Sequence, residues 1–223
     1  NRNLDLDIQD YVSVNFLAVA DVVDLLGGID LDLTDEEVVH MNNYCVETSE
    51  ITGKKYKKIE PEVAGTYHLN GVQAVSYSRI RYTEGGDFQR TSRQRLVIEK
   101  IAEKAKKADL STINKIIDAV FPEITTSFTS GEIVKMSTGL LQYSIGDNEG
   151  FPMDNETPDS IPGYQGSYVV PKGLEENVIK LHKFLFPDED YTPTDTVKEI
   201  SDHIKDVTGI YSDDSEDSTE DNG

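Results

Sequence analysis

The feature that most constrains the fold is a change from helical to strand periodicity within residues 16–34. Apolar side chains recur every three or four positions over residues 16–26, which predicts an amphipathic helix, and Gly27-Gly28 provides its C-terminal stop. The next segment, IDLDLT, alternates apolar and polar residues, as a strand with one buried face does. A helix that leads through a glycine turn into such a strand predicts an α/β fold.

The remaining segments carry weaker versions of the same two patterns. Residues 12–16 alternate like a half-buried strand, and a long amphipathic helix is predicted over 91–108, with Thr91 or Ser92 as its cap and Val97 and Ile98 in its buried stripe. Shorter helices are predicted after Asn70-Gly71 and over 110–121, 129–141, 173–186 and 194–209, and a strand over 167–171. Thr129-Ser130 before Glu132 resembles an N-terminal capping signal. Residues 35–63 are polar and irregular, and we interpret them as a surface excursion.

Domain organisation is predicted from where the apolar pattern fades. We expect one domain over residues 1–186, a peripheral helical extension over 187–211 and an acidic disordered tail over 212–223, whose composition cannot support a core. The opening NRNLDLDIQD has neither a basic nor an apolar region of the kind that starts a signal peptide, and it reads as the middle of a domain. We therefore expect the chain to be part of a longer protein.

Composition excludes several classes of partner and site. The 223 residues hold 42 acidic and 21 basic side chains, a net charge of -21, which argues against nucleic acid and against a bare anionic membrane surface. The single cysteine, Cys45, excludes an internal disulfide and a cysteine-rich metal site. The four histidines are scattered along the chain and are interpreted as structural.

Positive charge is nevertheless concentrated in one segment, RIRYTEGGDFQRTSRQR, residues 79–95. Arg79 and Arg81, two positions apart, share a face of an extended stretch, and Arg90 and Gln94, four apart, share a side of the first helical turn. Guanidinium groups bind phosphate oxygens in pairs of hydrogen bonds, and a helix N-terminus adds backbone donors. The segment predicts a pyrophosphate pocket; salt bridges within an acidic protein are the alternative.

Three segments together resemble the second half of the LytR-CpsA-Psr domain: VNFLAVADVVDLLGGIDLDL, LNGVQAVSYSRIRY and GDFQRTSRQR. The order and spacing match over about residues 4–108, and the later GSYVVP resembles the final strand of that domain. The resemblance implies an α/β fold with a central mixed sheet flanked by helices (α-β-α), the N-terminal part of which lies outside this chain. It also implies a cavity that holds a polyprenyl pyrophosphate lipid.

The resemblance implies site residues and an activity as well. Arg79, Arg81, Arg90 and Gln94 match pyrophosphate-contacting residues, and Asp87 matches a nearby aspartate, so Asp87 and Arg90 are the candidate catalytic pair. Bracing Arg90 or capping the turn is the alternative role for Asp87. The implied reaction is transfer of a glycan phosphate, of teichoic acid or capsule type, from the lipid carrier to peptidoglycan.

The same resemblance implies an extracytoplasmic enzyme of the Gram-positive cell envelope, held by an upstream membrane anchor and assisted by Mg²⁺. The metal-binding aspartates of the family come from strands before the start of this chain, so we expect the chain alone to lack the metal site and activity. A non-catalytic envelope protein that binds polyprenyl phosphates is the alternative function. Transcriptional attenuation has less support, because the chain is acidic and shows no helix-turn-helix pattern.

Overall fold

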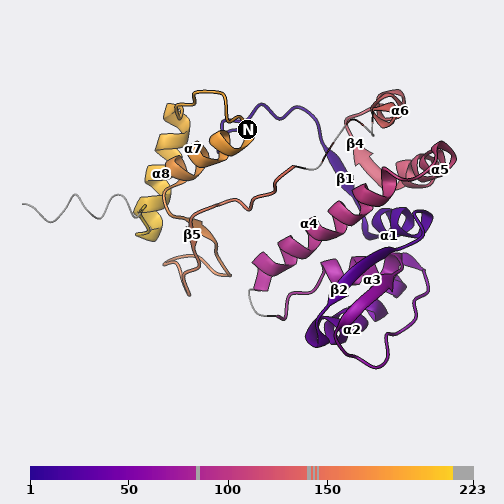
Figure 1. Ribbon diagram of the computed structural model, residues 1–223. Coiled ribbons are helices and arrows are strands. Elements are labelled where there is room, and N and C mark those ends of the chain that lie inside the picture. Colours follow the sequence, from indigo (N-terminus) through magenta and orange to yellow (C-terminus); the bar gives the residue numbers. More distant parts are fainter. Residues whose placement is uncertain (84–85, 140–141, 143, 145, 213–223) are drawn as a thin grey trace, which may run out of the picture. The chain divides into compact units, whose positions relative to one another are not determined.

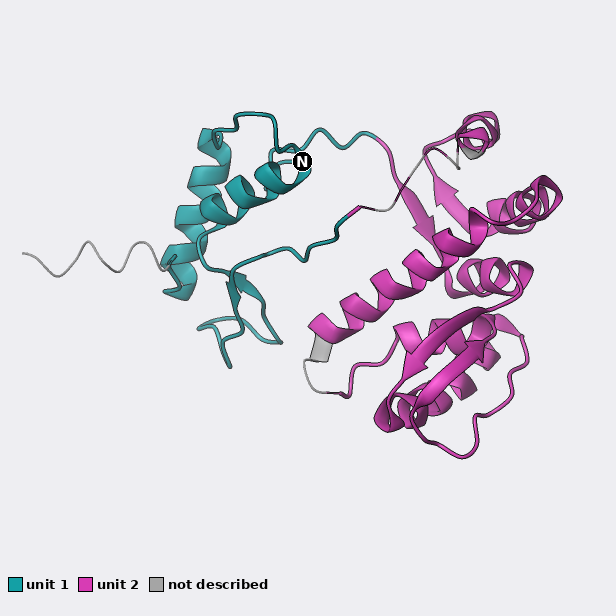
Figure 2. Cartoon of the chain, in the orientation of Figure 1, with its two compact units in different colours: residues 1–9, 147–223 teal, residues 10–146 magenta. Residues whose placement is uncertain are grey.

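The computed structural model describes residues 1–83, 86–139, 142, 144 and 146–212. These residues form two compact units (Figure 2): one comprises Asp10–Gly146, and the other joins Asn1–Gln9 to the segment that begins at Asp147. The predicted division at residue 186 does not coincide with this grouping, because it falls inside the second unit.

The unit of residues 10–146 mixes helices with short strands (Figure 1). In chain order its elements are β1 (Val12–Val14), α1 (Phe16–Leu25), β2 (Ile29–Leu33), α2 (Asp35–Thr52), β3 (Gly65–Leu69), α3 (Gly71–Ser78), α4 (Gly86–Ala105), α5 (Leu110–Val120), the 3₁₀ turn Phe121–Glu123, β4 (Ile124–Thr126) and α6 (Ser130–Thr138). The predicted helix-to-strand change at the start of the chain is confirmed by α1 and β2. In β2 the residues alternate between buried and exposed, as the sequence predicts.

Helix α2 corrects the interpretation of residues 35–63 as an irregular excursion. Its start carries a capping box, in which Thr34 and Glu37 each accept a hydrogen bond from the other's backbone N–H. Its buried stripe recurs every three or four residues: Val38, Met41, Asn42, Cys45, Thr48 and Thr52. Half of this stripe is polar, so its mean hydropathy is low and the helical period is hidden in the sequence.

The buried polar residues of α2 are stable inside the fold because they have hydrogen-bond partners. Asn42 donates to the carbonyl of Ile59 at 3.0 Å and accepts from its N–H at 3.1 Å, which holds the following loop against the helix. Thr52 donates its hydroxyl to the carbonyl of Thr48 at 2.7 Å. Satisfied in this way, buried polar groups avoid the desolvation penalty that an unpaired group would carry.

The core of this unit lies where α1, α2 and α3 pack against the antiparallel pair β2–β3. Apolar side chains from all five elements meet there: Val23, Ile29, Leu31, Leu33, Val38, Met41, Cys45, Leu69, Val72 and Tyr77. Helices α1 and α3 approach very closely at Gly71, where an added Cβ would lie 2.2 Å from the carbonyl oxygen of Ala20. Only glycine permits this backbone contact.

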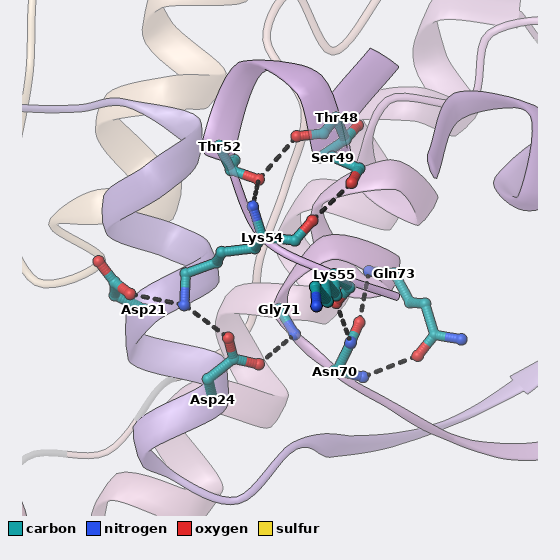
Figure 3. A network of polar contacts seen from close by, with 10 residues as sticks. All are labelled: Asp21, Asp24, Thr48, Ser49, Thr52, Lys54, Lys55, Asn70, Gly71 and Gln73. Carbon is teal, nitrogen blue, oxygen red and sulfur yellow. Dashed lines mark hydrogen bonds and ion pairs between the residues drawn. The ribbon is translucent and has the colours of Figure 1, made fainter. Parts of the chain in front are cut away.

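A polar network joins α1, α3 and the loop after α2 (Figure 3). The Lys54 ammonium lies 2.7 Å from a carboxylate oxygen of Asp21 and 2.7 Å from one of Asp24. Asp24 also accepts the backbone N–H of Gly71 at 2.7 Å. The side chain of Asn70 caps α3 and donates to the carbonyl of Lys55, so the loop is fixed at both helices.

The strands pair two by two among the described residues, as β1–β4, β2–β3 and β5–β6, and each pair is antiparallel. The fold is therefore mixed α/β, as predicted, but the described residues do not form the central mixed sheet. All three residues of β1 are exposed, although the alternation in residues 12–16 predicts a half-buried strand. The sequence of β1 alternates with a period of two residues, but packing covers neither face of the strand.

Helix α4 begins earlier than predicted, at Gly86 rather than near Thr91, so Thr91 and Ser92 lie inside the helix and do not cap it. Its stripe is also narrower than predicted: Val97 is buried, but the Ile98 side chain is 60% exposed. The capping signal predicted before α6 is confirmed, because Thr129 and Glu132 exchange backbone hydrogen bonds at 2.8 and 3.3 Å.

The second unit contains β5 (Asn155–Glu156), β6 (Val170–Pro171), α7 (Leu174–Leu185) and α8 (Asp195–Thr208). Helices α7 and α8 share a core in which Val178 and Val197 are fully buried. Residues on either side of position 186 thus pack together. The predicted acidic tail lies outside the described residues, apart from Ser212.

The N-terminal segment is held in this second unit by a small network around Asp5. The Tyr191 hydroxyl donates to Asp5 at 2.6 Å, and Thr194 donates both its N–H and its hydroxyl to the same carboxylate. Burial opposes the change, but these hydrogen bonds lower the pKa of Asp5 below its ordinary value. His182 of α7 stacks on the Tyr191 ring at 3.6 Å, and its Nε2 lies 2.8 Å from the Leu4 carbonyl oxygen, so the chain start contacts α7 as well as the N-cap of α8.

Candidate functional site

A cavity of about 320 Å³ opens beside the C-terminal end of α3. Eight residues line it: Phe16, Tyr44, Ser78, Arg79, Arg81, Tyr82, Arg90 and Gln94. They come from the start of α1, the middle of α2, the end of α3, the following loop and α4. All four side chains that the sequence predicts for a pyrophosphate pocket are thus brought to one cavity.

Helix α4 supplies Arg90 and Gln94 from successive turns, so both side chains face the cavity, as their spacing predicts. The N-terminus of this helix does not lie after Arg90, as the sequence predicts, because α4 starts at Gly86 and Arg90 lies one turn inside it. The unpaired backbone N–H groups of a helix belong to its first turn, before Arg90. The charge that faces the cavity therefore comes from guanidinium side chains.

The guanidinium of Arg79 is fixed from two directions. On one edge Nη2 lies 2.7 Å from a Glu47 carboxylate oxygen, and Nη1 donates to the Thr48 hydroxyl at 3.0 Å. The plane of the group lies over the Phe16 ring at 4.7 Å and the Tyr44 ring at 5.2 Å. Among the described residues these contacts use two of its five N–H donors.

The contacts of Arg79 show which residues sequence reasoning missed. Tyr44, Glu47 and Thr48 lie on α2, which was interpreted as irregular, and Phe16 was assigned to the core stripe of α1 although its side chain is 40% exposed. Glu47 and Thr48 follow Tyr44 by three and four positions, the spacing of one helical face. That spacing is the signal that could have found them once α2 was recognised.

Two other arginines of the basic segment have different surroundings. Arg93 is only 6% exposed and lies away from the cavity lining, where it makes hydrogen bonds to Glu37 and to the loop after α3. Arg95 donates to the Ser92 hydroxyl one turn back at 3.1 Å. The segment therefore does not act as one positive surface, because α4 directs its arginines to several sides.

Asp87 belongs to the first turn of α4, but its side chain lies outside the described residues, so its catalytic role stays a prediction. Within the part of the chain that the structure describes, no three His, Cys, Asp or Glu side chains lie close enough to hold a metal ion together. None of the described helices has both the length and the apolarity that a membrane crossing needs.

The lysines of the 54–58 loop are partly neutralised by neighbouring acids. Lys54 is paired with Asp21 and Asp24, and Lys58 lies 3.3 Å from carboxylate oxygens of both Glu60 and Glu62. A loop that satisfies its charges internally attracts an external anion less strongly. The arginine-lined cavity is the stronger candidate for anion binding.

Comparison with known proteins decides the family. The sequence profile of the LytR_cpsA_psr family matches residues 1–167. The chain belongs to the LytR-CpsA-Psr family. The match includes every residue that lines the cavity and extends well beyond the three segments that carry the resemblance in the sequence.

Individual members of the LytR-CpsA-Psr family show how much of their length this chain represents. Over 145 residues it is 34% identical to Biofilm regulatory protein A of Streptococcus mutans, covering 63% of this chain and 32% of that protein. Over 202 residues it is 29% identical to the polyisoprenyl-teichoic acid–peptidoglycan teichoic acid transferase TagV of Bacillus subtilis, covering 85% and 46%. The chain thus spans less than half of these relatives.

Two solved structures share the fold. The crystal structure of a protein described as a transcriptional regulator, EF0465 of Enterococcus faecalis, matches with a TM-score of 0.64 at 21% identity, covering 93% of this chain and 69% of that one. The crystal structure of B. subtilis TagV matches with a TM-score of 0.54 at 23% identity, covering 85% and 67%. At this level of identity the likeness establishes the LytR-CpsA-Psr fold and leaves the chemistry to the residues of the cavity.

Proposed function

We propose that this chain is part of a phosphotransferase that moves a phosphate-linked glycopolymer, of teichoic acid or capsule type, from a polyprenyl pyrophosphate carrier to peptidoglycan. The observation that carries the proposal is the cavity in which Arg79, Arg81 and Arg90 meet Gln94. Three guanidinium groups and one amide are matched to the oxygens of a pyrophosphate. The polyisoprenyl-teichoic acid transferase TagV, a relative, supports the choice of substrate class.

In the proposed reaction, an acceptor hydroxyl oxygen of peptidoglycan forms a bond to the phosphorus that carries the glycan. The bond from that phosphorus to the bridging oxygen breaks, and polyprenyl phosphate leaves. Negative charge grows on the leaving phosphate, where Arg79 and Arg90 would stabilise it, because fixed positive groups in a partly enclosed site need little reorganisation. The hydroxyl proton passes to a carboxylate, for which Asp87 is the candidate.

The implied Mg²⁺ would neutralise phosphate charge, but it needs carboxylate ligands beyond those that the described residues bring together. In the same way, the central mixed sheet would have to include strands other than the pairs described. We propose that both belong to the complete domain, and that the protein acts on the outer side of a Gram-positive membrane. The activity is then a property of the whole protein, and pyrophosphate binding is the property to test on this chain.

The test is native mass spectrometry of the purified chain after mild detergent release, with detection of a co-purified polyprenyl phosphate. We expect lipid on the wild type and none on the Arg79→Ala plus Arg90→Ala variant. Arg95→Ala is the matched control, because it removes an arginine of the same helix that does not line the cavity. Lipid retained equally by all three proteins would contradict the assignment of the cavity.

The alternative, a protein that binds polyprenyl phosphates without turnover, makes a different prediction for the full-length protein. If the proposal is correct, supplied lipid-linked glycopolymer is consumed, polyprenyl phosphate is released, and the glycan appears on peptidoglycan. Binding without release of the carrier, in the presence of Mg²⁺, would favour the non-catalytic alternative.

A further inference from the structure

We propose that Arg93 is a positioning residue, which holds the loop that carries Arg81 and Tyr82 into the cavity wall. The inference rests on the proposed function, because it assigns a task within the same pyrophosphate site. In the sequence Arg93 is one of several arginines in a basic segment; in the structure it is the buried one, at 6% exposure. A different role from that of Arg90 follows from where its guanidinium points.

The guanidinium of Arg93 connects three elements. Its Nε donates to a Glu37 carboxylate oxygen on α2 at 2.9 Å. Its Nη1 donates to the carbonyl of Ile80 at 3.3 Å, and its Nη2 donates to the Thr83 hydroxyl at 2.7 Å. Ile80 and Thr83 are the residues on either side of the Arg81-Tyr82 pair, and both members of that pair line the cavity.

The geometry of α4 explains why the neighbouring residues Arg93 and Gln94 have different surroundings. Successive residues on an α-helix are rotated by about 100°, so Arg93 and Gln94 leave α4 in clearly different directions. Gln94 faces the cavity together with Arg90, whereas Arg93 enters the protein. Its contact with Glu37 is shielded on both sides, with the two side chains 7% and 14% exposed.

Burial makes this arrangement specific. An arginine that is removed from water is stable only if its charge and its donors are satisfied, and here Glu37 supplies the charge while the loop supplies acceptors. The Tyr77 ring, with its centroid 5.9 Å from the guanidinium, borders the pair. Burial, with the negative charge of Glu37 in support, raises the pKa of Tyr77 to about 12, so the phenol stays neutral next to the pair.

Lysine could keep the positive charge at position 93 but could not reproduce the arrangement. A guanidinium directs planar donors toward Glu37, Ile80 and Thr83 at once, whereas an ammonium is a compact point charge on a flexible stem. Loss of the contacts on the loop side loosens the segment between Ile80 and Thr83, which carries Arg81. The loop would then have to be ordered again when an anion binds, which weakens binding.

The experiment measures the affinity of the 223-residue chain for inorganic pyrophosphate by isothermal titration calorimetry. The main variant is Thr83→Val, which removes one loop contact and leaves the Arg93–Glu37 pair in place; Arg93→Lys is the stronger variant. We expect pyrophosphate binding to weaken about three- to tenfold for Thr83→Val and more than about tenfold for Arg93→Lys. Thr66→Val, a threonine on β3 outside the cavity lining, is the matched control and should bind like the wild type.

A double-mutant cycle separates positioning from general destabilisation. In an Arg81→Ala background Thr83→Val should weaken pyrophosphate binding by less than about twofold, because the loop then has no guanidinium to position. An equal loss in both backgrounds would overturn the inference, even if Arg93→Lys failed to fold. The inference would also be overturned if Thr83→Val and Arg93→Lys bound pyrophosphate with wild-type affinity while Arg79→Ala abolished binding. No binding by the wild type would overturn the proposed function and this inference with it.

Discussion

Replacing Lys54 with methionine tests whether the network of Figure 3 stabilises the unit of residues 10–146. Methionine keeps an unbranched side chain of similar length and removes only the ammonium. The variant leaves Asp21 and Asp24 without their shared cation on neighbouring turns of α1. Asp24 keeps its hydrogen bond from the Gly71 N–H, so part of the network survives.

The magnitude follows from the degree of burial. An exposed ion pair contributes about 0.2 to 1 kcal/mol, whereas removing one partner of a buried pair costs about 3 to 5 kcal/mol. The side chains of Lys54, Asp21 and Asp24 are 24%, 25% and 36% exposed, which places the network between these limits. We expect Lys54→Met to lower the free energy of unfolding by about 2 kcal/mol, which lowers the melting temperature by about 4 to 8 °C for a chain of this size.

The assay is thermal and urea unfolding monitored by circular dichroism, with Lys57→Met as the matched control. Lys57 is an exposed lysine of the same loop, and its loss should change the free energy of unfolding by less than about 0.5 kcal/mol. Equal stability of the two variants would refute the argument from burial.

The pH dependence provides a second check of the same argument. Burial alone would lower the pKa of Lys54, but its hydrogen bonds to Asp21 and Asp24 outweigh burial and raise the pKa above the ordinary value of 10.5. Because the folded pKa is the higher one, the stabilisation is fully present below pH 10.5 and is lost as the pH rises through the folded pKa. The difference between wild type and Lys54→Met should therefore be constant near neutral pH and shrink only in strong alkali.

Three further predictions concern the same unit. Glu47→Gln should weaken pyrophosphate binding about three- to tenfold in calorimetry, because Arg79, which Glu47 fixes, becomes mobile. The control Glu50→Gln, on the same helix, should not weaken binding. Tighter binding by Glu47→Gln would show that Glu47 competes with the anion. Burial raises the pKa of the Cys45 thiol to about 11. Iodoacetamide at pH 8 should therefore leave the folded chain unmodified in intact-mass spectra and label the chain fully in denaturant. Rapid labelling of the folded chain would contradict the burial of Cys45. Gly71→Ala should destabilise the unit by about 3 kcal/mol in urea unfolding, because the alanine Cβ would clash with the Ala20 carbonyl of α1. An unfolding midpoint near that of the wild type would disprove this close contact.

The parts of the fold that the sequence predicted correctly are those governed by local signals. Helix α1 and strand β2 have clean apolar periods and a glycine stop between them, and the Thr129–Glu132 cap lies within one turn of chain. Helix α2 was missed although its capping box is also local, because buried Asn42, Thr48 and Thr52 disguise its stripe. Asn42 and Thr48 have partners that lie far along the chain, Ile59 and Arg79, which no local pattern reports.

The candidate site also contains some residues that the sequence predicted and others that it did not. Spacing and family resemblance led to Arg79, Arg81, Arg90 and Gln94, and all four line one cavity. Arg90 and Gln94 lie one turn apart on α4, as predicted, whereas Arg79 is the helical C-cap of α3 and not part of an extended stretch. The partners of Arg79 could not be predicted in the same way. Glu47 and Thr48 are separated from it by 32 and 31 residues, and they meet it only because α2 packs against α3.

By itself the sequence determined the class of fold, the family and the arginines that face the cavity, because periodicity, caps and motif spacing act over a few residues. Tertiary structure alone decided that Arg93, from the same basic segment, is buried among Glu37, Ile80 and Thr83. The chemical difference between Arg90 and Arg93 is nil, and their surroundings set their roles. Arg90 lines the cavity in which we propose that the phosphate binds, whereas a guanidinium directed inward must find its counter-charge within the protein.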